Sequence, residues 1–132
     1  MELASFDEIY LRGNGVEESD IAYLNERLSW DLPFELKHLY LQANGVGIQV
    51  NDIFAEFWSI DQIVSFNEIY EHIIERKYVF FASSSEGYDS YAYQKADRKI
   101  YVFPTDCGIE DLSDGEFCAN NLDELIEYLK KK

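Results

Sequence analysis

Residues 80–94, FFASSSEGYDSYAYQ, contain the side chains that most resemble a set of catalytic residues. Three consecutive serines are followed by an acid and a glycine, so a serine nucleophile is the first chemistry to consider. A hydrolase of the nucleophile-elbow type needs a G-x-S-x-G turn between a strand and a helix. The segment SSSEG lacks the leading glycine, and the apolar or alternating residues on both sides of it predict two strands. The pattern therefore favours a polar turn between strands over a loop that carries a nucleophile.

A serine nucleophile would also need a base, and the chain offers only two histidines, His38 and His72. Both fall on predicted amphipathic helices among charged neighbours, which is typical of surface histidines. Catalytic groups can come together in space without a sequence motif. An enzyme that uses Ser85 or a carboxylate-bound metal therefore remains a rival hypothesis, although no motif supports it.

The acid-rich segment DCGIEDLSDGE, residues 106–116, is the main candidate for a metal site. An EF-hand loop placed here would need an oxygen ligand at 112 and a glutamate at 121, and the chain has Leu112 and Asn121. Cys107 and Cys118 lack the CxxC spacing and nearby histidine of a zinc site, so we expect two small, half-buried apolar residues. No phosphate-binding glycine motif is present. The sequence predicts neither a metal nor a cofactor.

The charge balance is strongly acidic, with 26 acids against 11 bases and a net charge of -15. Such a field repels nucleic acid and anionic membrane surfaces, and it attracts a basic protein partner. Between Lys99 and Lys130 the chain has no lysine or arginine but eight acids. This run is either a docking face for a cationic partner or a surface that serves solubility alone, and composition does not separate the two.

The apolar spacing predicts four main helices. Ile21, Leu24 and Leu28 repeat at three and four residues in the segment 17–29, and a second helix starts around Pro33 and stops at Asn44-Gly45. These two are expected to form a compact helical hairpin. The other two run from a Ser59–Gln62 capping box to about Arg76 and from Asn120/Asn121 to the end. A possible capping box at Ser5–Glu8 predicts a further short helix.

Strands are expected once or twice within 47–58 and then over 78–82, 88–94 and 99–103, with a hairpin turn at Asp114-Gly115. This order predicts a single α+β domain over residues 1–132, with a mainly antiparallel sheet and about four helices against one side. The first ten residues lack a signal peptide's basic and apolar regions, and no apolar run approaches the roughly 20 residues of a membrane span. We expect a cytoplasmic protein.

The succession of landmarks resembles the SUKH superfamily, a fold shared by a yeast cell-wall-synthesis regulator and many bacterial immunity proteins. The resemblance covers residues 17–129. Its landmarks are Ile21/Leu24/Leu28, Leu32-Pro33, Asn44-Gly45, FWSIDQIVSFNEIYE with Trp58, Asn67 and Tyr70, ASSSEGYDSYAY, KIYVF and NNLDELIEYL. Three departures stand out: a loop with the single Gly87, Tyr88 where family members have an acid, and Asn25 where many have a glutamate.

The resemblance implies a non-enzymatic immunity protein that binds and neutralises a toxin domain. A general interaction module with an endogenous regulatory partner is the alternative. The net charge suits a basic, nuclease-type toxin, because opposite charges steer association. The expected contacts, with Tyr88 as an aromatic anchor, are Tyr88, Asp89, Asp106, Glu110, Asp111, Asp114 and Glu116.

Overall fold

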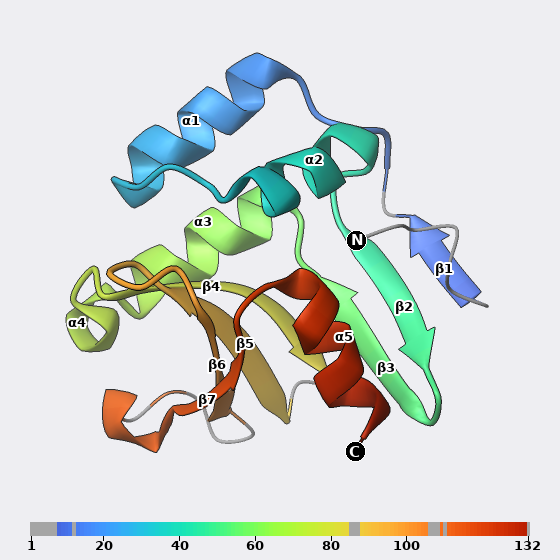
Figure 1. Cartoon of the computed structure of the whole chain (residues 1–132). Helices are drawn as coiled ribbons and strands as arrows, with labels where there is room; N and C mark the ends of the chain where they lie inside the picture. Colours follow the sequence, from blue (N-terminus) through green and yellow to red (C-terminus); the bar gives the residue numbers. More distant parts are fainter. Residues whose placement is uncertain (1–7, 12, 85–87, 106–108, 110, 132) are drawn as a thin grey trace.

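A computed structural model describes residues 8–11, 13–84, 88–105, 109 and 111–131. Its strands form one seven-stranded sheet in chain order, and each neighbouring pair is antiparallel (Figure 1). The strands are β1 (Glu8–Leu11), β2 (Val46–Val50), β3 (Ile53–Phe57), β4 (Tyr78–Ser84), β5 (Asp89–Gln94), β6 (Ile100–Pro104) and β7 (Glu116–Ala119). The predicted α+β fold with an antiparallel sheet is confirmed.

The helices are α1 (Glu18–Leu28), α2 (Phe34–Gln42), α3 (Ile60–Ile69), α4 (Glu71–Ile74) and α5 (Leu122–Lys130), with a 3-10 turn η3 (Leu112–Asp114). Two predicted starts are confirmed in detail. Ser59 Oγ accepts a hydrogen bond from the backbone N–H of Gln62, and the side-chain Oε1 of Gln62 accepts one from the backbone N–H of Ser59. Asn121 accepts from the N–H of Glu124 at the start of α5. These side chains satisfy N–H groups that a helix leaves without intrahelical partners.

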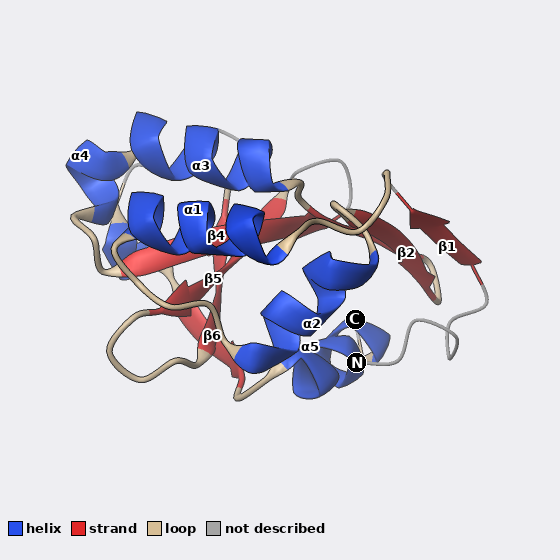
Figure 2. Ribbon diagram, turned by 90° about the horizontal axis from the view of Figure 1, so that it is seen from above, coloured by secondary structure: helices blue, strands red, loops and turns tan. Residues whose placement is uncertain are grey.

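The first two helices do not form the compact hairpin that the sequence predicts. Helix α1 packs alongside α3 (Figure 2), whereas α2 meets the start of α5 on the same side of the sheet, where the Glu35 carboxylate accepts a hydrogen bond from the N–H of Leu122. The connection between α1 and α2 is fixed by other contacts: the side chain of Asn25 accepts a hydrogen bond from the N–H of Leu32 at 3.0 Å. The residue that departs from the family pattern in the first helix therefore holds this turn.

Three local expectations are wrong. The N-terminal segment described from Glu8 onward is strand β1, because its backbone pairs with β2. The helix expected to reach Arg76 breaks at Tyr70, after which α4 adds one turn. Asp114-Gly115 ends the turn η3 and does not form a two-residue hairpin. Gly115 has a packing reason instead, since a Cβ there would lie 2.4 Å from the ring of Phe103.

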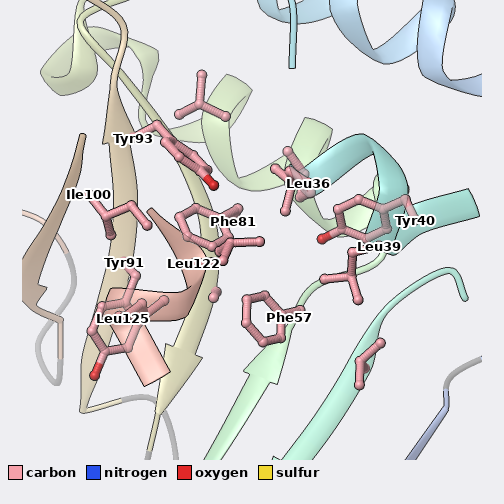
Figure 3. Close-up of a cluster of buried hydrophobic side chains, with 14 of the residues drawn as sticks. Leu36, Leu39, Tyr40, Phe57, Phe81, Tyr91, Tyr93, Ile100, Leu122 and Leu125 are labelled. Carbon is pink, nitrogen blue, oxygen red and sulfur yellow. The ribbon is translucent and has the colours of Figure 1, made fainter. Parts of the chain in front are cut away.

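The sheet separates two apolar clusters. The larger cluster lies between the sheet and α1, α2, α3 and α5, and Figure 3 shows its strand residues Phe57, Phe81 and Tyr93 among leucines from α2 and α5. The smaller cluster lies on the opposite face around Phe80 and Phe103. The predicted alternation in β5 is confirmed, because Tyr91 and Tyr93 enter the larger cluster while Ala92 enters the smaller one.

Candidate functional site

A groove of about 950 Å³ runs between α3 and the ends of β3 and β4, on the side of the smaller cluster. One wall is a single face of α3, since Gln62, Phe66 and Ile69 are spaced at i, i+4 and i+7. The volume lies in the upper part of the roughly 300–1,000 Å³ range of ligand pockets. Its lining residues are Asp52, Phe54, Glu56, Trp58, Gln62, Phe66, Ile69, Ser83, Ser84 and Tyr88.

Trp58, one of the residues that line the groove, is held by three hydrogen bonds. Its indole N–H donates to Ser83 Oγ at 3.0 Å, and its backbone N–H donates to the carbonyl of Phe81 at 2.9 Å. Its carbonyl accepts a hydrogen bond from the Tyr40 hydroxyl. Burial raises the pKa of Tyr40 above its usual value, so this hydroxyl stays a donor at alkaline pH as well as at neutral pH. The Trp58 ring also packs on Phe66, with centroids 4.7 Å apart, and is therefore pre-positioned.

The groove combines exposed apolar surface with negative charge. Ile69 is 65% exposed and Tyr88 is 57% exposed, although both are large apolar or aromatic side chains. Asp52 and Glu56 contribute two carboxylates, and the lining residues that the structure describes include no lysine or arginine. Exposed apolar surface of this kind marks binding sites. The arrangement can hold a ligand that is both apolar and cationic.

The predicted contact residues surround the ends of β5, β6 and β7. Asp89 pairs with Pro104, and the Tyr88 carbonyl accepts a hydrogen bond from the N–H of Thr105 at 2.9 Å. Glu116 pairs with Val102 on the next strand. We call the described residues Tyr88, Asp89, Asp111, Asp114 and Glu116 the acidic surface. Asp106 and Glu110 from the same prediction lie outside the described residues.

The acidic surface wraps around the edge of the sheet and is not one flat face. Asp89 and Glu116 occupy positions of the strand pleat that face the larger cluster. Asp111 and Asp114 flank Leu112, which packs on the smaller cluster of the other face. Asp111, Asp114 and Glu116 are exposed, and Asp89 is half-buried. Tyr88 belongs both to this surface and to the groove.

The serines of the opening stretch have structural partners where the chain is described. Ser83 Oγ accepts from Trp58, and Ser84 Oγ lies 3.0 Å from the Tyr91 hydroxyl. Ser85 lies outside the described residues. Both histidines are exposed, as predicted, and His38 stacks on Phe34. Ser83 and Ser84 therefore support the walls of the groove.

No group of three or more histidine, cysteine, aspartate or glutamate side chains in the described ranges is arranged to hold a metal ion. Cys118 is half-buried beside the larger cluster, as expected, and Cys107 lies outside the described residues. None of the described helices has the length and apolar character needed to cross a lipid bilayer.

Comparison with known families decides the relationship. The SMI1 / KNR4 family (SUKH-1) model matches residues 15–128, which is most of the chain. The chain belongs to this family. A search of curated proteins finds no match, so the assignment rests on the family model. The resemblance inferred from the sequence landmarks is confirmed. Several landmark residues of this SUKH-1 member make contacts that explain why they are there.

Two of these landmark residues, Asn44 and Trp58, position or line the walls of the groove. Asn44 accepts a hydrogen bond from the N–H of Ile60 and so ties the end of α2 to the start of α3. Trp58, the aromatic residue before the capped helix, lines the groove. Sequence reasoning identified both residues as family landmarks. It did not identify the groove, because the lining comes from separate segments between Asp52 and Tyr88. The one local signal that could have indicated the groove is the shared helical face of Gln62, Phe66 and Ile69.

Proposed function

We propose that this SUKH-1 protein is a non-enzymatic immunity protein that binds and neutralises a basic, nuclease-type toxin domain in the cytoplasm. One observation carries the proposal. Exposed Asp111, Asp114 and Glu116 gather at the strand ends within a stretch that has no lysine or arginine between Lys99 and Lys130. A nuclease must attract a polyanion, so its cleft is basic, and an acidic protein can occupy that cleft by charge complementarity.

Tyr88 supplies the apolar part of such an interface. Its ring is 57% exposed, while its backbone is joined to β6 through Thr105. Tyrosine is enriched among the residues that dominate binding energy, because it brings a large rigid area and a polar hydroxyl. The acids around it provide specificity and a fast approach, and the aromatic ring provides contact energy.

The net charge of -15 gives this mode of binding a physical signature. Long-range attraction raises the association rate with a basic partner, and salt screens it over a Debye length of about 8 Å at physiological ionic strength. The association rate with the toxin should therefore fall steeply as salt rises, while the dissociation rate changes little.

Binding, and not catalysis, is the proposed activity. Ser83 and Ser84 are engaged by Trp58 and Tyr91, and both histidines are exposed on helices. These positions give no support to a serine hydrolase in this part of the chain. The proposed ligand is a protein, and neither nucleic acid nor a membrane surface suits the charge.

The test is a pull-down of tagged protein from its native cytoplasm at low salt, followed by mass spectrometry and growth assays with the captured protein. The expected partner is a basic, toxin-like domain that elutes at higher salt and whose toxicity disappears when this chain is co-produced. A housekeeping partner without toxicity would replace the proposal by the regulatory interaction module. Capture of no basic protein would overturn it.

A further inference from the structure

The groove at α3 has no assigned ligand, and its chemistry is more specific than that of the acidic surface. We propose that it receives an arginine-bearing segment of the protein partner, with the guanidinium between the aromatic side chains and the two carboxylates. The inference rests on the proposed function for the identity of the partner, although not for the chemistry of the groove itself.

The aromatic side chains provide the first part of the argument. Trp58 and Phe66 pack against each other at 4.7 Å, and Tyr88 lies at the exposed rim. Guanidinium groups are planar and weakly hydrated, so they stack on aromatic faces more readily than ammonium groups do. Because Trp58 is fixed by Phe81, Ser83 and Tyr40, the groove loses little conformational entropy when it is occupied.

The charges provide the second part. Asp52 in the turn between β2 and β3 is exposed, and Glu56 on β3 is half-buried. No lysine or arginine occurs between Lys37 and Arg76, the stretch that supplies most of the lining. A phosphate or carboxylate ligand would be repelled here, whereas a guanidinium can bond a carboxylate through two parallel N–H groups. Charge complementarity therefore selects a cationic occupant.

The size of the groove provides the third part. A volume of about 950 Å³ exceeds what one side chain fills, so the occupant is a short segment that carries the arginine. Ile69 on the α3 wall, at 65% exposure, offers an apolar contact for a neighbouring residue. We therefore expect an apolar residue directly beside the arginine.

The test is an NMR titration of the labelled full chain with the peptide acetyl-Ala-Leu-Arg-Ala-amide. The same peptide with citrulline in place of arginine is the matched control, because citrulline keeps the shape and loses the charge. The indole N–H signal of Trp58 should move saturably while that of Trp30, which packs on Tyr93, stays still. The citrulline peptide should bind at least about fivefold more weakly.

Variants locate the effect. The double variant Asp52→Asn, Glu56→Gln should bind the arginine peptide at least about fivefold more weakly than the unchanged chain does. Glu26→Gln with Asp31→Asn removes the same charge at exposed positions outside the groove and should change the affinity less than about twofold. Equal binding of both peptides, an unmoved Trp58 signal up to about 10 mM peptide, or equal effects of the two double variants would overturn the inference.

The outcomes separate this inference from the proposed function. If a basic toxin is captured but binds the Asp52→Asn, Glu56→Gln variant as tightly as the unchanged chain, the immunity proposal stands and the groove inference fails. If the arginine peptide binds as expected and no toxin is captured, the groove inference stands and the immunity proposal fails.

Discussion

The side chain of Asn67 pairs with both backbone polar groups of Phe80. Its Nδ2 donates to the Phe80 carbonyl at 2.9 Å, and its Oδ1 accepts from the Phe80 N–H at 2.9 Å. Strand β3 pairs with β4 only from Ala55 to Phe57, so the side chain of Asn67 continues the ladder where β3 has ended. One buried amide thus replaces a strand residue and fixes α3, the wall of the groove, to the sheet.

Asn67→Ala should therefore lower the free energy of unfolding by about 2–4 kcal/mol, because it leaves two buried backbone groups of Phe80 without partners. Urea denaturation measures the change. Asn120→Ala, which removes an exposed amide that contacts Glu124, is the control and should cost less than about 0.5 kcal/mol. Similar costs for the two variants would contradict the role assigned to Asn67.

Glu35 connects three elements in the larger cluster. Its Oε1 accepts from the Tyr93 hydroxyl at 2.8 Å, and both its oxygens lie 3.1 Å from the N–H of Leu122 at the start of α5. A carboxylate is favourable there because the first turn of a helix carries partial positive charge. A residue of α2 therefore caps α5 and holds the hydroxyl of a β5 tyrosine.

We expect Glu35→Ala to cost about 2–3 kcal/mol of stability and Glu35→Gln about 1 kcal/mol, since glutamine keeps an acceptor but loses the charge. In a double-mutant cycle, Glu35→Ala should cost about 1 kcal/mol less when Tyr93 is already phenylalanine. The control is Glu18→Ala, which removes an exposed ion pair with Lys37 and should cost below about 1 kcal/mol. Strict additivity of the cycle would show that Glu35 and Tyr93 do not interact.

Stability should decrease above about pH 10. Burial raises the pKa of Tyr40, and burial together with Glu35 raises the pKa of Tyr93, so both stay protonated in the folded chain. In the unfolded chain a tyrosine ionises near pH 10. The unfolded state then binds fewer protons than the folded state, and the free energy of unfolding falls as pH rises. Partial burial lowers the pKa of Lys95, which acts in the opposite direction below about pH 10.5.

Urea midpoints at about pH 8, 10 and 11 measure this dependence, and tyrosine absorbance near 295 nm reports the ionisation. Tyr93→Phe should have a shallower loss of stability above about pH 10 than the unchanged chain, because one of the protons that the folded chain retains is gone. The free energy of unfolding of Tyr93→Phe at about pH 8 gives the cost of the lost hydrogen bond. This cost is the same at each pH and therefore does not affect the comparison of how steeply stability falls with pH. Identical slopes would mean that Tyr93 ionises while the chain remains folded.

Local signals predicted much of the fold. The Ser59–Gln62 capping box and the Asn121 cap depend on residues three apart, so the sequence specifies them directly. The alternation in β5 was equally readable because one side of the strand is filled by tyrosines and the other by small residues. The family landmarks succeeded for the same reason, since most of them are helix ends and strand patterns.

Non-local packing caused the errors. The capping-box pattern at Ser5–Glu8 favours a helix, but pairing with β2 places the described segment from Glu8 in a strand. The apolar stripe through Phe66, Tyr70 and Ile73 suggested a continuous helix. These residues instead pack on the smaller cluster, while Ile63 packs on the larger one. A helix buried on two sides has no single stripe, so periodicity does not show where it breaks.

The predicted acidic contacts stay a prediction, and the groove was not predicted from the sequence. The acids between Lys99 and Lys130 are close in sequence, and their exposure follows from their charge. The groove depends on residues from β3, α3 and β4, which only the sheet pairing brings together. Among the predicted contacts that the structure describes, Tyr88, chosen as an aromatic anchor next to a predicted strand, is the one that also lines the groove.

If the proposed toxin partner binds the acidic surface, a kinetic prediction follows. Asp111→Lys with Asp114→Lys should slow association about tenfold at low salt and make its salt dependence shallower, because attraction to the basic cleft is replaced by repulsion. Stopped-flow mixing at several salt concentrations measures both. The dissociation rate should change less, since exposed charges at the rim of an interface mainly affect encounter.

Net charge alone could produce a similar effect, so the matched control is Glu26→Lys with Asp31→Lys. This control variant changes the total charge by the same amount, but at positions near Arg27 and Arg98. Other basic side chains, Arg76 and Lys95, also lie in that region. Steering by the acidic surface requires the first variant to slow association much more than the second. Equal slowing would assign the effect to total charge, and unchanged kinetics in the first variant would remove Asp111 and Asp114 from the interface. Only the unequal result would place the cationic cleft of the proposed partner over the strand ends.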